Sequence, residues 1–93
     1  MNNPYYDLIK AAETMTEPEF LTAYPGMESL CAAVNRTMPE IVSVSGLSGR
    51  DICRRFGISY RTMEDWTAPR RACPVYVRLM IQELLGIYSP LTL

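Results

Sequence analysis

The stretch FGISYRTMEDW, residues 56–66, places a glycine between two apolar residues and follows them with a serine. Gly57 stands where a helix would end, because glycine adopts the left-handed backbone conformation that terminates helices at little cost. Ile58 is apolar and is expected to anchor the turn, and Ser59 is a residue type that favours the position just before a new helix. The stretch therefore predicts two helices joined by a tight glycine turn, the arrangement of a helix-turn-helix.

The residues on either side of this turn carry the signals of the two helices. Residues 48–51 have the spacing of a capping box, so the first helix is predicted over about 48–56. The second helix is predicted over about 60–67, and helical spacing places Met63 and Trp66 on its inner face. Both helices thus have an apolar side with which to pack.

Helix signals also fill the rest of the chain. Asn3-Pro4 can cap and begin a helix, and residues 16–19 and 37–40 are two further capping boxes. Apolar residues recur at helical spacing over about 27–35 and again over 75–88. The sequence therefore predicts an all-α fold, a bundle of about five to seven short helices.

Charge divides the chain into two parts. Residues 1–35 hold five acidic residues against one basic residue, a net charge of −4, whereas residues 36–93 hold eight arginines against five acidic residues, a net charge of +3. Six of these arginines lie between Arg50 and Arg71, and clustered arginine is typical of a phosphate-binding surface. We therefore expect one structural domain, in which an acidic helical extension (1–35) packs on a helix-turn-helix DNA-binding core (36–93).

Composition argues against several other classes of protein. The chain has no histidine, and its three cysteines form no CxxC pair, so we expect no catalytic triad, no metal site and no disulfide framework. Gly-rich phosphate motifs are absent, and we expect neither a cofactor nor an enzyme. No apolar run approaches the roughly 20 residues of a membrane span, and the first residues lack a secretory pattern. We expect a cytoplasmic protein without a membrane partner.

Residues 37–88 resemble the helix-turn-helix family of phage repressors and xenobiotic-response-element regulators. The resemblance is carried by Gly46-Leu47-Ser48, Ile52-Cys53, Phe56-Gly57-Ile58-Ser59, Thr62-Met63, Trp66, Arg70-Arg71 and Pro74-x-Tyr76. The chain departs from the family pattern at Gly49, where glutamine is frequent, and at Thr67 and Pro69, where glutamate and glycine are frequent. The resemblance implies a phage-repressor-like fold and a bacterial or phage transcriptional regulator that binds double-stranded DNA as a dimer on a pseudo-palindromic site.

The docking geometry of a helix-turn-helix gives candidate roles to eight residues. In this motif the amino end of the second helix lies at the base edges of the major groove. Arg61 suits a bidentate contact to guanine, and the Thr62 methyl group suits thymine. The other candidates are Tyr60 at the base edges, Ser48 and Ser59 on phosphates through backbone N–H groups, and Arg50, Arg70 and Arg71 flanking the groove. For Glu64 and Asp65 we expect either rejection of a phosphate or pairing with Arg61.

The last predicted helix is apolar over too wide a surface to pack on one side only. Either the acidic extension or another subunit covers its second side. We expect a homodimer through Met80, Ile81, Leu84 and Leu85.

A second function fits the same fold. A helix pair can contact a protein as readily as DNA, and fold alone does not decide between them. The alternative is therefore a protein-interaction module, such as an antitoxin or adaptor, whose acidic first 35 residues bind a basic partner.

Overall fold

The computed structural model describes residues 4–89, which form seven α-helices and no strand. The expected cap at Asn3 lies outside this range. The all-helical prediction is confirmed for the described residues. The helices are α1 (Pro4–Thr14), α2 (Glu17–Ala23), α3 (Glu28–Asn35), α4 (Met38–Ser45), α5 (Gly49–Phe56), α6 (Tyr60–Thr67) and α7 (Val75–Leu84).

Three of the helices begin at the capping boxes expected from the sequence. At the start of α2, α4 and α5, a serine or threonine hydroxyl accepts the backbone N–H three residues on, and the acid at that position accepts the N–H of the cap residue. These hydrogen bonds lower the pKa of each capping carboxyl, so the acids stay ionised beside the positive ends of their helices. The pairs are Thr16 with Glu19, Thr37 with Glu40, and Ser48 with Asp51.

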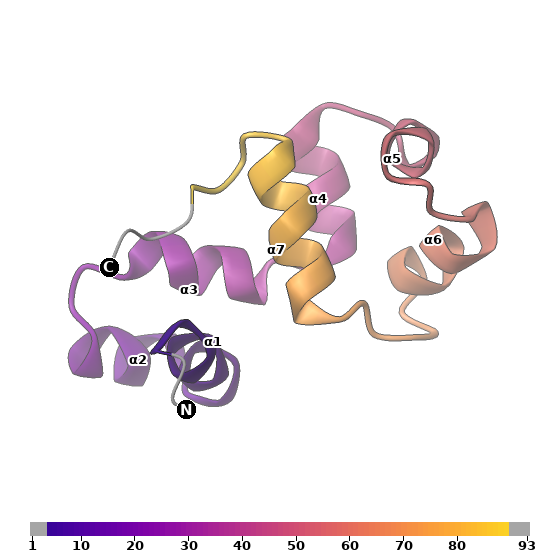
Figure 1. Ribbon diagram of the computed structural model, residues 1–93. Helices are drawn as coiled ribbons and strands as arrows, with labels where there is room; N and C mark the ends of the chain where they lie inside the picture. Colours follow the sequence, from indigo (N-terminus) through magenta and orange to yellow (C-terminus); the bar gives the residue numbers. More distant parts are fainter. Residues whose placement is uncertain (1–3, 90–93) are drawn as a thin grey trace.

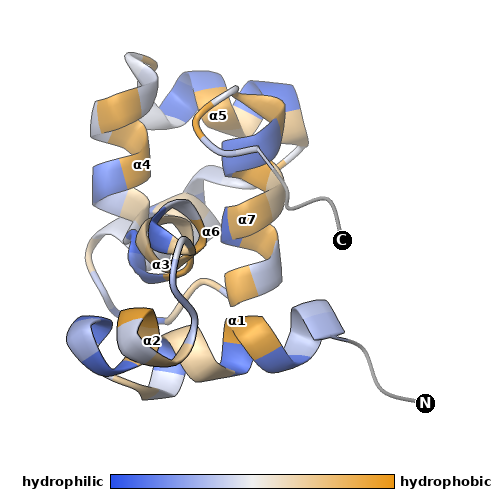
Figure 2. Cartoon of the chain, turned by 90° about the vertical axis from the view of Figure 1, so that its left-hand side faces the viewer, coloured by the Kyte–Doolittle hydropathy of each residue, from blue (hydrophilic) through white to orange (hydrophobic). Residues whose placement is uncertain are grey.

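The helices are arranged in two groups around α7. Figure 1 shows α1, α2 and α3 at one end, α4 and α7 in the middle, and α5 and α6 at the other end. Each group has its own apolar cluster, one around Phe20 and Leu30 and the other around Ile41 and Ile52. Helix α7 contributes residues to both clusters, and Figure 2 shows several hydrophobic bands along it. The acidic end of the chain thus packs on the middle of the molecule.

The joint between α3 and α7 is polar as well as apolar. Gln82 is 0% exposed, and its side-chain amide donates to the carbonyl of Ala33 at 2.9 Å. The guanidinium of Arg78 donates to the carbonyls of Val34 and Arg36 at 2.8 and 2.7 Å. These donors satisfy carbonyls at the end of α3, which have no partner within the helix.

Helix α7 is shorter than the predicted span of 75–88. It ends at Leu84 because Gly86 adopts a left-handed φ of 75°. The N–H of Gly86 donates to the carbonyl of Glu83, and the N–H of Ile87 donates to that of Gln82. This is the Schellman arrangement that closes a helix.

Candidate nucleic-acid interface

The turn between α5 and α6 has the geometry that the sequence predicts. Gly57 has a φ of 67° in the left-handed region, and the N–H of Ile58 donates to the carbonyl of Cys53 at 3.0 Å. The Ile58 side chain packs against the core. Ser59 then caps α6 by accepting the N–H of Thr62 at 3.1 Å. The turn therefore fixes where the first residues of α6 point.

The outward face of α6 is formed by Tyr60, Arg61, Glu64 and the C-cap residue Ala68, which are all exposed, while Met63 is buried. Successive helical residues are rotated by about 100°, so Glu64 lies about 40° from Tyr60 and about 60° from Arg61 around the axis. We call these four residues the α6 outward face. It contains one base and one acid.

Arg50 joins α5 to this face. Its guanidinium carbon lies 5.0 Å from the centroid of the Tyr60 ring, a cation–π contact. A cleft of ≈ 540 Å³ runs beside the pair, with Val42 of α4 on one side and Tyr60 and Glu64 on the other. The structure therefore brings Arg50, Tyr60 and Glu64 to one surface, a grouping that the sequence analysis did not make. Positions 50 and 60 lie ten residues apart on two helices, and no local pattern connects them.

Not every candidate residue lies on this surface. Thr62 lies about 160° around α6 from Glu64. Its hydroxyl oxygen accepts a 2.8 Å hydrogen bond from the hydroxyl of Ser59, so the structure joins Thr62 to the cap and not to Tyr60 or Arg61. The N–H of Ser48 already donates to Asp51 at 3.3 Å, which leaves it unavailable to a phosphate. The expected phosphate contact through the Ser48 N–H is therefore not supported.

Acids of α5 and α6 engage two further arginines. Arg54 pairs with Asp51 at 3.2 Å on the surface of α5. Asp65, whose side chain is 14% exposed, pairs with Arg70 at 3.1 Å, and its carbonyl accepts the N–H groups of Arg70 and Arg71. The expected pairing of Asp65 with Arg61 is wrong, because the loop after α6 folds back and places Arg70 nearer. Among residues 4–89, Arg61 has no ion pair.

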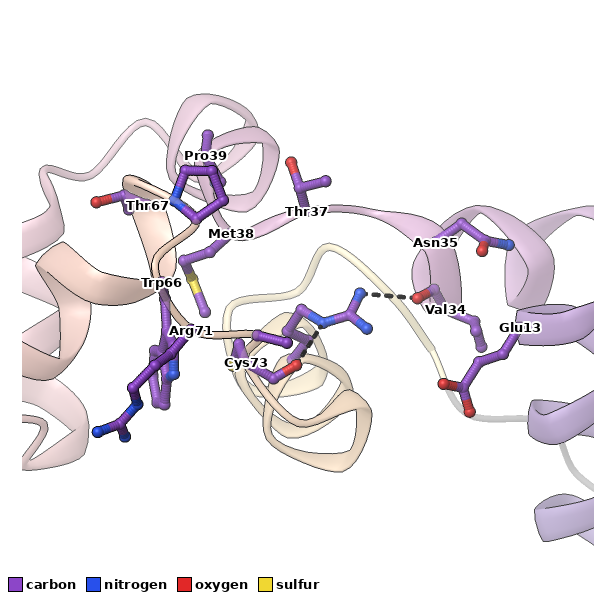
Figure 3. Close-up of a pocket in the computed structure, with 13 residues that line it drawn as sticks. Glu13, Val34, Asn35, Thr37, Met38, Pro39, Trp66, Thr67, Arg71 and Cys73 are labelled. Atoms are coloured by element: carbon purple, nitrogen blue, oxygen red, sulfur yellow. Dashed lines mark hydrogen bonds between the residues drawn. The ribbon is translucent and has the colours of Figure 1, made fainter.

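Arg71 lies in a different environment from Arg70. It lines a cleft of ≈ 420 Å³ bounded by α1, α3, α4 and α6, and Figure 3 shows it beside Trp66. Trp66 lies about 160° around α6 from Glu64. The tandem arginines thus differ in their contacts: Arg70 pairs with Asp65, whereas Arg71 is exposed and has no ion pair among residues 4–89.

The same cleft contains a thiol. Cys73 is half-buried, and burial raises the pKa of its thiol to about 11, so the sulfur is protonated at neutral pH and is a poor nucleophile. Within the described range, no group of three or more His, Cys, Asp or Glu side chains is placed to hold a metal ion. Nor does any helix between residues 4 and 89 have the length and hydrophobicity to cross a membrane.

Comparisons with models of known protein families, with curated proteins and with solved structures find no match to this chain.

Proposed function

We propose that this chain is a sequence-specific DNA-binding transcriptional regulator of the helix-turn-helix type, similar to phage repressors, with α6 in the major groove. The observation that carries the proposal is the exposed amino-terminal turn of α6. There Tyr60 is held by Arg50, and Arg61 extends from the same surface without an ion pair among the described residues. In helix-turn-helix proteins this turn meets the base edges.

The residues of this surface have separate roles in the proposal. Arg61 donates to guanine through its planar guanidinium. Arg50 and Tyr60 act as a unit, since the ring and the guanidinium hold each other in place beside the groove. In this proposal a phosphate lies at the amino end of α6, which has no acid in its first turn to oppose that charge.

Selection of bound duplexes from a random pool tests the proposal, followed by titration of the preferred site at several salt concentrations. Arg61→Ala should cost about 1–3 kcal/mol on that site and relax the choice of base there. Arg71→Ala is the matched control, because Arg71 is exposed and lacks an ion pair within residues 4–89. Its loss should weaken binding to all sequences equally and flatten the salt dependence by about one unit.

Arg70 is unsuitable as the control, since Arg70→Ala leaves the mostly buried Asp65 without its partner. If Arg61→Ala loses affinity uniformly, with no change in base preference, α6 does not read sequence and the proposal fails.

A protein-interaction module is the second candidate function. It is favoured by the exposure of all five acidic residues of the first 35, which present a negative surface at the end of the molecule opposite α6. An antitoxin or adaptor would use that surface against a basic partner. If selection enriches no duplex and a basic protein is bound in a salt-sensitive manner, this function replaces DNA binding.

A further inference from the structure

Glu64 occupies the middle of the α6 outward face. Tyr60 lies on one side of it around the helix and Arg61 on the other, and all three side chains are exposed. Among the described residues, Glu64 has neither an ion pair nor a side-chain hydrogen bond. Arg54 pairs with Asp51, Arg70 pairs with Asp65, and the Arg50 guanidinium lies over the Tyr60 ring. Any partner that covers Tyr60 and Arg61 must therefore also meet this carboxylate.

A carboxylate pressed into the major groove restricts which bases can lie opposite it. The groove edges of guanine and thymine present acceptor oxygens, and guanine N7 is an acceptor too, so these bases repel a carboxylate. Adenine has one amino donor but places the acceptor N7 beside it. Cytosine offers its N4 amino group, the donor that glutamate and aspartate accept from in DNA complexes. A carboxylate that loses water without gaining a donor is strongly penalised.

We propose that Glu64 accepts a hydrogen bond from the N4 amino group of a cytosine, and that it determines a base pair one or two steps from the one contacted by Arg61. This inference rests on the proposed function and deepens it. Arg61 and Glu64 are three residues apart, about 4.5 Å along the helix axis, so the two contacts fall one or two base pairs apart. The preferred duplex should therefore contain a guanine contacted by Arg61 and, one or two base pairs away, a cytosine contacted by Glu64.

The test is selection of bound duplexes by the full chain and by two variants. Glu64→Gln should change the preferred base at one position from cytosine to adenine, because glutamine donates to N7 and accepts from N6 of adenine. Glu64→Ala should lose the preference at that position, which we expect to be about tenfold or more. The preference assigned to Arg61 should be unchanged in both variants. Glu83→Gln, an exposed change on α7, is the control and should leave the whole motif unaltered.

The outcomes separate this inference from the proposed function. If the wild-type chain selects no duplex, DNA binding itself fails. If it selects a motif that depends on Arg61, but the Glu64 variants select the same motif, the reading of cytosine is overturned while DNA binding stands. Uniformly tighter binding of every sequence by Glu64→Gln and Glu64→Ala also overturns it, since Glu64 would then only repel phosphates.

Discussion

At the scale of single residues, two glycines in α5 and its turn have different reasons to be glycine. Gly57 has a φ of 67°, and a Cβ there meets nothing within 4 Å, so backbone strain is the only cost of a side chain. Gly49 lies at the start of α5 outside the left-handed region, and a Cβ there would lie 3.6 Å from Met63 Cγ, an ordinary contact. The pair allows strain to be measured against a matched control.

We expect Gly57→Ala to destabilise the protein by about 1–2 kcal/mol, because an alanine pays that cost in the left-handed conformation. Gly49→Ala should be neutral or should stabilise by up to about 1 kcal/mol, because it restricts the unfolded chain and favours helix. Urea unfolding followed by circular dichroism measures both. Equal effects of the two changes would contradict the role assigned to the turn.

The residue scale also shows where prediction from sequence stops. Caps were predictable, because a hydroxyl and an acid three residues apart meet through the local geometry of one helical turn. The ion-pair partner of Asp65 could not be predicted from the sequence. Spacing favoured Arg61, but the observed Arg70 is brought there by a loop whose path depends on packing around Trp66 and Cys73. The contact between Arg50 and Tyr60 could not be predicted either, because it depends on how α5 and α6 pack against each other.

At the scale of elements, the contact of α7 with α3 includes two polar residues of α7, although the sequence of this helix is mostly apolar. Arg78 and Gln82 lie one helical turn apart, and both donate to carbonyls at the end of α3. The signal was present in the sequence as two polar side chains at i and i+4 on a helix that is otherwise nearly apolar. Gly86 is likewise a signal in the sequence, since its left-handed φ of 75° ends the helix although apolar residues continue beyond it.

Gln82→Leu should destabilise the protein by about 1–3 kcal/mol, because the carbonyl of Ala33 stays buried and loses its donor while the side-chain volume is kept. The neighbouring Glu83→Ala removes an exposed side chain and should change the free energy of unfolding by less than about 0.5 kcal/mol. Chemical unfolding of both variants makes the comparison. A Gln82→Leu protein as stable as the wild type would show that this hydrogen bond does not hold α3 against α7.

At the scale of the whole molecule, the apolar surface of α7 has three sides. One contacts α3 and another contacts α4. The third is a stripe of Tyr76, Met80 and Leu84, which are 65%, 56% and 70% exposed. The expected dimer surface was therefore partly misplaced, because Ile81 is buried and Leu85 packs against the core. The helical spacing of apolar residues could not show which of the three apolar sides of α7 packs on α3, which packs on α4 and which stays exposed.

We propose that a second copy of the chain covers this stripe. Residues four apart on a helix form a continuous ridge, and a two-fold axis places such a ridge against itself. Sedimentation equilibrium should then give a mass near twice the 10.6 kDa of one chain at high micromolar concentration. Met80→Glu should give a monomer, because the axis would bring two carboxylates together. Val44→Glu, which adds the same charge at an exposed apolar position of α4, should remain dimeric. A wild-type chain that stays monomeric both with and without DNA would contradict the two-fold contact, and each α6 would then have to bind its site alone.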